Sequence, residues 1–180
     1  MEIVEILKKP FTDIGKLVVG TVLGVIPIVH FVVLGFGIDN FKKPKEIPNF
    51  SVDQFILGVK AFLLGVLYSL VPFTLAVIGL YLDYTALMAF GLVLALSLLP
   101  AITRAILEMS KKNSFKDGLN FNKIFSETYT KKFLVPWLIS TLLSVVVGSL
   151  LELVPEVGWM VSTYVSTVIF WTCLGARIKI

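Results

Sequence analysis

Four long apolar runs constrain this chain more than any other feature of its sequence. Each run is about 20 residues or longer, which lets an α-helix cross the ~30 Å hydrocarbon core of a bilayer. A soluble domain of 180 residues could not bury four such runs, and 57% of the residues are hydrophobic, above the usual share of a soluble protein. The sequence therefore predicts an all-α integral membrane protein with four transmembrane helices, over residues 55–82, 84–107, 133–151 and 158–176.

A fifth apolar segment, residues 14–38, is interrupted by Pro27. It can cross the membrane once as a kinked helix, giving five spans, or turn back at Pro27 as a broken, re-entrant hairpin. The links between the long runs at Asp83 and at 152–158 carry only acidic charges. If these links face outward, the hairpin places all 16 Lys and Arg residues inside, whereas the single span leaves Lys8, Lys9 and Lys16 outside. The positive-inside rule favours the hairpin, with both termini cytoplasmic.

A short internal sequence repeat also favours the hairpin. The sequence Val-Ile-Pro-Ile-Val-His-Phe at 25–31 resembles Leu-Val-Pro-Glu-Val-Gly-Trp at 153–159. Both follow the pattern apolar-apolar-Pro-x-Val-x-aromatic, and the second copy lies at a clear turn between two apolar runs. Repeats of this kind are common in membrane folds, so we expect Pro27 to mark a turn as well.

Two charged stretches have the pattern of amphipathic helices that lie in the membrane interface. In residues 2–9, Ile3, Ile6 and Leu7 share one helical face. In residues 121–132, aromatic and aliphatic residues recur every three or four positions and lysines lie off that stripe. We expect both helices at the inner leaflet of a single helical membrane domain that spans residues 1–180.

Few residues could carry chemistry. The chain has one His and one Cys and no recognisable catalytic or nucleotide-binding motif, so we expect neither an enzyme nor a cofactor or metal site. Candidate ligand-binding residues are His30, Lys60 and Arg104. His30 follows the break at Pro27 and could relay protons, but a neutral His bonded to a backbone carbonyl explains it as well. Lys60 and Arg104 lie at similar depth in consecutive spans and could jointly face an anionic headgroup or substrate, or simply extend toward the interface.

Several motifs resemble a known family. They are the start Met-Glu-Ile-x-Glu-x-Leu-x-x-Pro-Phe, the block Val-Ile-Pro-Ile-Val-x-Phe-Val-Val-Leu-Gly at 25–35, Gly58-x-Lys60, and Val-Pro-x-Val-Gly-Trp at 154–159. With the loop between Pro44 and Pro48, they resemble an uncharacterised, mainly archaeal family of small multi-pass membrane proteins, a domain of unknown function. The resemblance covers nearly the whole chain and implies a helical domain in a prokaryotic plasma membrane. It supplies no activity and no site residues.

Two functions fit these observations. The first is a non-enzymatic scaffold or assembly protein that contacts anionic headgroups at the inner face, and a protein partner or a second copy of the chain. The alternative is a small transporter or channel component, which the broken first segment and the hydroxyl-rich last span favour. The absence of an acid at mid-depth in any run counts against ion-coupled transport. Nucleic-acid binding is excluded, because no soluble stretch is long enough to form a basic domain.

Overall fold

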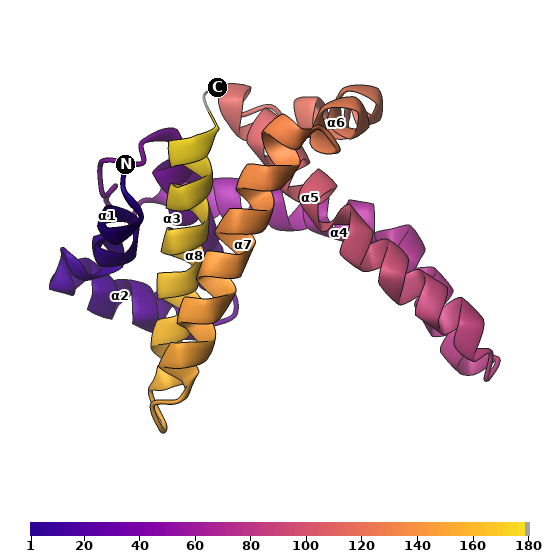
Figure 1. The fold of residues 1–180 in the computed structure, drawn as a ribbon, viewed down its shortest axis with the longest axis horizontal. Coiled ribbons are helices and arrows are strands. Elements are labelled where there is room, and N and C mark those ends of the chain that lie inside the picture. Colours follow the sequence, from indigo (N-terminus) through magenta and orange to yellow (C-terminus); the bar gives the residue numbers. More distant parts are fainter. Residues whose placement is uncertain (179–180) are drawn as a thin grey trace. The chain divides into compact units, whose positions relative to one another are not determined.

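The computed structural model describes residues 1–178, and over that range it is helical with no strand (Figure 1). Lys179, one of the bases counted above, lies outside the described residues. The helices, with two short 3₁₀ helices named η1 and η2, are α1 Ile3–Lys8, η1 Lys9–Phe11, α2 Ile14–Val25, α3 His30–Lys42, α4 Val52–Tyr81, α5 Thr85–Lys112, η2 Phe115–Leu119, α6 Phe121–Thr128, α7 Lys131–Glu152 and α8 Gly158–Arg177.

The four predicted spans are confirmed as helices. In the part of the chain that the structure describes, α4, α5, α7 and α8 are long and apolar enough to cross a membrane, and α2 is a shorter apolar helix. Each observed helix extends one to five residues beyond at least one end of its apolar run. At the start of α4, Ser51 and Gln54 form a reciprocal cap, since each side chain accepts a hydrogen bond from the other residue's backbone N–H.

The segment around Pro27 is a broken hairpin. The backbone leaves the helical conformation at Ile26, and α3 begins four residues later. A Cβ placed on Gly24 would lie 4.0 Å from a γ-methyl of Val33, whereas nine residues of continuous helix extend about 13.5 Å. At the other end, Lys16 Nζ donates a hydrogen bond to Ile47 O at 3.0 Å, which joins the start of α2 to the loop after α3. The chain therefore turns back, as the charge distribution predicts.

The similarity between the two proline turns extends to their hydrogen bonds. Each turn has three residues, beginning at its proline, and leads directly into the next helix. His30 N donates to Ile26 O at 2.8 Å, and at the equivalent position Gly158 N donates to Val154 O at 3.1 Å. The two similar sequences therefore form turns closed by an equivalent hydrogen bond, but the backbones differ, because Glu156 has a positive φ of 65° and Ile28, at the equivalent position, does not.

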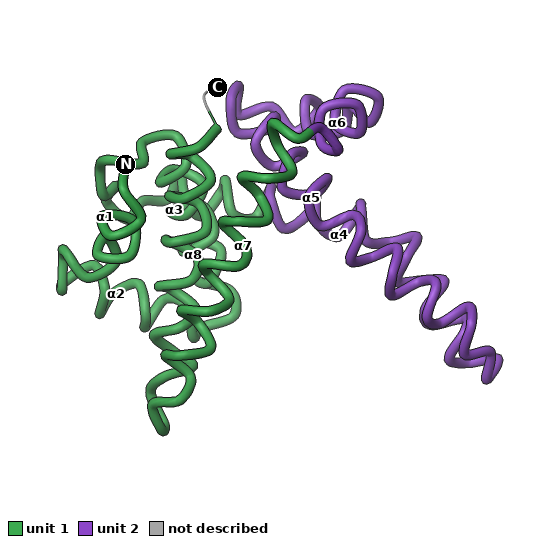
Figure 2. The backbone as a smooth tube through the Cα atoms, in the orientation of Figure 1, with its two compact units in different colours: residues 1–59, 131–180 green, residues 60–130 purple. Residues whose placement is uncertain are grey.

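The chain forms two compact units, shown in Figure 2. Unit 1 consists of residues 1–59 and 131–180, and unit 2 of residues 60–130. The helix α4 begins in unit 1 and continues in unit 2. Each unit has its own packing, described separately below.

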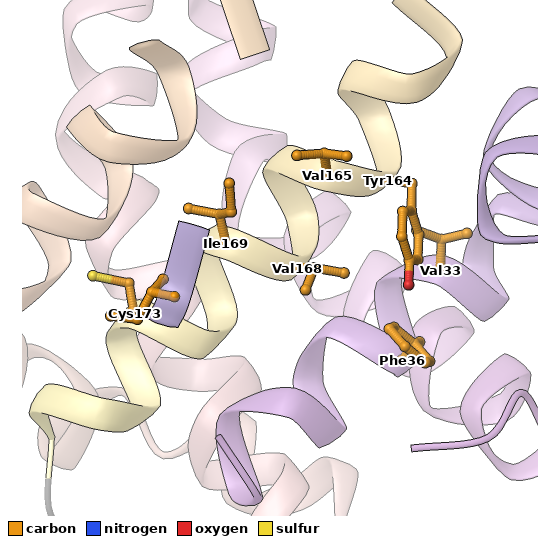
Figure 3. Packing of buried hydrophobic residues seen from close by; sticks show 8 residues of the cluster. Val33, Phe36, Tyr164, Val165, Val168, Ile169 and Cys173 are labelled. Atoms are coloured by element: carbon orange, nitrogen blue, oxygen red, sulfur yellow. The ribbon is translucent and has the colours of Figure 1, made fainter. Parts of the chain in front are cut away.

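The core of unit 1 is built around α8. Its buried residues come from α1, α3 and α8 and include Phe36 and Tyr164 (Figure 3). The rings of Phe36 and Phe50 stack with centroids 4.6 Å apart, and Tyr164 tilts against both. Gly20 of α2 lies directly against the Tyr164 ring, where a Cβ would overlap it. A small residue therefore lets these two helices approach closely.

In unit 2, α4 and α5 pack through close backbone contacts and are joined by a tight turn. Asp83 adopts a positive φ of 51°, which lets three residues connect the two helices. A Cβ on Gly79 would overlap the backbone of Met88, and a Cβ on Gly91 would overlap the backbone of Ala76. Glycine at these two positions brings the helix backbones into direct contact.

Candidate functional site

A buried carboxylate lies near the charged end of α5. The side chain of Glu108 is only 4% exposed, and it forms ion pairs with Arg104 at 2.9 Å and with Lys111 at 2.6 Å, one turn away on either side. Residues three and four apart share one face of a helix, so the sequence of α5 itself brings these charges together. A buried carboxylate is stable only when it is paired in this way.

Helix α6 is attached to this carboxylate. Lys123 Nζ donates a hydrogen bond to Glu108 Oε2 at 2.6 Å, and Arg104 forms an ion pair with Glu127 of α6. The hydrogen bond to Glu108 raises the pKa of Lys123 above its ordinary value, so Lys123 stays protonated throughout the physiological range. Asn120 caps the start of α6 by accepting a hydrogen bond from Lys123 N. Five charged side chains therefore hold α6 against the end of α5; we call them the Glu108 cluster (Arg104, Glu108, Lys111, Lys123 and Glu127).

An aromatic row runs along α6. Phe121 and Phe125 pack beside the ring of Tyr68, and Tyr129 follows one turn later. Tyr68 donates a hydrogen bond to Gly118 O at 3.0 Å, and Tyr129 donates one to Ser97 O at 2.8 Å. Even so, the side chains of Phe121, Phe125 and Tyr129 remain 39–52% exposed. We call Phe121, Phe125 and Tyr129 the aromatic row.

The structure gives the two predicted basic ligands different partners. Arg104 pairs with Glu108 and Glu127. Lys60 Nζ instead donates to the side-chain oxygen of Asn113 at 2.8 Å and to its backbone oxygen at 3.3 Å. Asn113 ends α5 in the left-handed conformation that commonly terminates helices. Each base is thus engaged in holding the end of α5, and a joint ligand site stays a prediction.

His30 occupies a structural position at the proline turn. Its half-buried ring places Nδ1 3.2 Å from Gly24 O, which accepts a hydrogen bond when Nδ1 carries the proton. This is the backbone-bonded arrangement that the sequence allowed as the alternative to a proton relay. Among residues 1–178, no group of three or more His, Cys, Asp or Glu side chains is placed to hold a metal ion.

Unit 1 contains a buried lysine, Lys9, that the sequence pattern did not predict. Lys9, in η1, is 5% exposed, and its Nζ donates to Pro44 O at 2.7 Å. Burial lowers the pKa of Lys9 to about 8, although the charge of Glu46 acts in the opposite direction. Lys9 lines a cavity of about 500 Å³ together with Lys8 and Lys45. The only sequence signal for this site was the adjacent pair of lysines before Pro10. Such a pair is usually exposed, so it did not predict burial.

A second cavity in unit 1 lies between α7 and α8, where hydroxyl groups line a groove of about 330 Å³. Glu152 accepts a hydrogen bond from Ser162 at 3.2 Å, and Ser166 donates to Ser144 O at 3.2 Å. Glu152 and Ser144 are eight residues apart, or about 12 Å along the helix. The groove therefore extends less than half of the ~30 Å needed to cross a bilayer.

Both segments that were expected to form interfacial helices contain helices, but with different bounds. The first is an α-helix over Ile3–Lys8 that continues as the 3₁₀ helix Lys9–Phe11, beyond the predicted end at residue 9. The second, α6, ends at Thr128, and α7 starts at Lys131, so residues 121–132 are not one helix. The aromatic period continues across that break, which is why the sequence pattern did not reveal it.

The comparisons with known proteins identify a family and no activity. Neither the curated proteins nor the solved structures give a match. Residues 18–155 match the family described as "Protein of unknown function (DUF4013)". This range runs from α2 to the proline turn after α7, and so contains all of unit 2, including the Glu108 cluster and α6. Because the match covers most of its length, the chain belongs to the DUF4013 family.

Proposed function

We propose that this protein is a non-enzymatic membrane scaffold that rests on the anionic headgroup layer through α6. The observation that carries the proposal is that α6 is held in place by ion pairs while its aromatic side chains stay exposed. The Glu108 cluster holds α6 in place, while the aromatic row stays partly exposed. Aromatic side chains on a charged amphipathic helix are typical of segments that lie at the level of lipid headgroups.

The charges beside α6 select the lipid. Lys112 and Lys116 of unit 2 are exposed close to the helix in sequence, and Lys123 is 46% exposed while it pairs with Glu108. Lysines next to an interfacial helix attract anionic headgroups, by about 1 kcal/mol each near the surface. Under the positive-inside rule the same lysines lie in the cytoplasm, and both termini with them, in a plasma membrane. The lack of a catalytic motif in the sequence favours a role in binding or assembly over catalysis.

Quenching by brominated lipids tests this proposal. A small fluorophore is attached to a cysteine replacing Phe125, in a Cys173→Ala background, and the protein is reconstituted in mixed bilayers. We expect brominated phosphatidylglycerol to quench the probe more strongly than brominated phosphatidylcholine at equal mole fraction. The preference should weaken in a Lys112→Gln/Lys116→Gln variant. A probe at Leu82, which is 62% exposed at the end of the α4–α5 pair, serves as the control and should show no preference. Equal quenching by both lipids at position 125 would refute the proposal.

A small transporter is the second candidate, and the hydroxyl-lined groove between α7 and α8 favours it. Serine hydroxyls and one carboxylate could form an entrance for a small polar solute or a cation. A flux assay in liposomes, comparing the native protein with a Glu152→Gln variant, tests this role. Solute entry that exceeds protein-free liposomes and falls in the variant would support transport, and a rate equal to protein-free liposomes would count against it.

A further inference from the structure

The cavity around Lys9 in unit 1 has the character of an anion site. It measures about 500 Å³ and opens between the α1–η1 segment and the loop after α3. Its polar side chains are dominated by lysine ammonium groups, which are donors only. The residues that line it are Met1, Glu5, Lys8, Lys9, Thr12, Pro44, Lys45 and Ile47.

The charges around this cavity are not balanced. Three lysines face one carboxylate, that of Glu5, which already accepts a hydrogen bond from the backbone of Glu2 at 3.0 Å. Glu46 acts on Lys9 only through its field, and it pairs with the exposed Lys43 at 3.4 Å. The cavity therefore carries a net positive charge that no side chain in its lining neutralises.

Among these lysines, Lys9 gives the strongest indication of an anion site. Its ammonium group is buried, and its hydrogen-bond partner, Pro44 O, is neutral. A buried charge normally has an opposite charge beside it, because desolvation is otherwise costly. An ammonium group carries three donors, so Lys9 can hold Pro44 O and still donate to an anion in the cavity.

The surroundings of the cavity indicate where such an anion comes from. Ile3, Val4 and Phe11 on the same segment are 45–55% exposed. Apolar side chains beside a basic pocket are typical of a segment that lies at the boundary between headgroups and acyl chains. There the phosphate of a lipid would lie level with the lysines, and its acyl chains would run along the apolar side chains.

We propose that this cavity binds a phosphate group, held by Lys9, Lys8 and Lys45 and supplied by an anionic lipid headgroup. This goes beyond the proposed function, because it places a discrete ligand in unit 1, whereas that proposal rests on α6 in unit 2. A free phosphate ester offers the same chemistry, and the experiment below separates the two sources.

Native mass spectrometry and a binding titration on the full-length protein in detergent test the proposal. The probes are short-chain phosphatidic acid, phosphatidylglycerol and phosphatidylcholine, with glycerol phosphate and inorganic phosphate as free anions. We expect the two anionic lipids to bind about tenfold more tightly than phosphatidylcholine. If glycerol phosphate binds as tightly as the anionic lipids, the phosphate chemistry holds and the ligand is a soluble ester.

Three variants decide which residues bind. Lys9→Met and Lys45→Ala should each weaken binding of the anionic lipids, by about tenfold for Lys9. Lys43→Ala is the matched control, because it removes the same charge from the same loop but does not line this cavity. The proposal is overturned if Lys9→Met binds like the native protein, or if Lys43→Ala weakens binding as much as Lys45→Ala.

The test does not require every variant to fold. Lys45 is exposed, so Lys45→Ala remains informative even if Lys9→Met fails to fold. Lys9→Arg keeps the charge and should retain most of the affinity. Quenching at position 125 should be unchanged in both Lys9→Met and Lys45→Ala, so loss of the phosphate site and failure of the α6 proposal give different results.

Discussion

Glu108 and Lys123 join two helices of unit 2 through a single hydrogen bond of 2.6 Å, from the Lys123 ammonium to a carboxylate that is only 4% exposed. The buried acid belongs to α5 and the partly exposed base to α6. Removing the acid would take one partner from Arg104, which still pairs with Glu127, and from the partly exposed Lys111 and Lys123. Such a loss costs more than the loss of an exposed pair, because hydrogen bonds to a buried charged group contribute more than exposed ion pairs do.

We therefore expect Glu108→Gln to destabilise the protein by about 1–3 kcal/mol, because it removes the charge that accepts hydrogen bonds from Lys111 and Lys123. The loss should be local to α6, where amide hydrogen exchange over residues 121–128 should become faster. Hydrogen exchange measured by mass spectrometry, together with the midpoint of thermal unfolding, checks both effects. Lys43→Ala breaks an exposed pair with Glu46 and should cost less than about 1 kcal/mol. Equal effects of the two substitutions would show that the Glu108 cluster does not hold α6.

Two glycines in unit 1 mark the close backbone approach between α3 and the start of α4. A Cβ on Gly35 would overlap the backbone oxygen of Gln54, and a Cβ on Gly58 would overlap that of Phe31. We expect Gly35→Ala and Gly58→Ala each to destabilise the protein by about 1–3 kcal/mol, because the helices must separate to admit a methyl group. Chemical or thermal unfolding in detergent measures the loss.

Gly65→Ala is the matched control for these two substitutions. Gly65 also lies inside α4, but the nearest side-chain atom to its Cβ position is 3.9 Å away, on Ile102. The substitution should be neutral or stabilise the helix by up to about 1 kcal/mol, because alanine loses less backbone entropy than glycine. If all three variants lose the same stability, close packing is not the reason for glycine at positions 35 and 58.

The sequence predicts the backbone of this protein better than its charged sites. Runs of apolar residues decide the spans, and Pro27 with the charge distribution decides the hairpin, because both follow from local rules. The Glu108 cluster follows only partly from such rules. Arg104, Glu108 and Lys111 share one face of α5 by their spacing, and that signal was available. The partners on α6 depend on how the chain folds back after η2, which no local pattern specifies.

The burial of Lys9 is likewise not predictable from local sequence patterns. Two adjacent lysines before a proline read as an exposed end of an interfacial helix. The loop after α3 covers one of them, and Pro44 accepts its hydrogen bond. That contact joins residues 35 positions apart, so periodicity could not predict it.

The buried Lys9 should make stability depend on pH in the alkaline range. Its folded pKa of about 8 lies below the ordinary value of 10.5. Below pH 8 both states hold the proton and the burial penalty is complete. Between pH 8 and 10.5 the unfolded chain binds more protons than the folded one, so stability at this site rises with pH. We expect thermal unfolding in phosphate-free buffer to show this rise, and Lys9→Met to be more stable at pH 7 and to lack it. A native protein whose stability relative to Lys9→Met is constant from pH 7 to 10 would contradict the assignment.

Labelling of single cysteines tests the topology of the hairpin. The native thiol, Cys173, is buried, and replacing it with alanine gives a background without cysteine. We expect Glu5→Cys and Lys45→Cys to react with an impermeant maleimide from the same side of the membrane, the cytoplasmic side. The hydrogen bonds from Lys9 to Pro44 and from Lys16 to Ile47 already join the two ends of the hairpin at one place. Asp83→Cys and Glu156→Cys, in the two acidic turns, should react only from the opposite side. Reaction of positions 5 and 45 from opposite sides would mean that residues 14–38 cross the membrane, and would leave three lysines on the outer side, against the positive-inside rule.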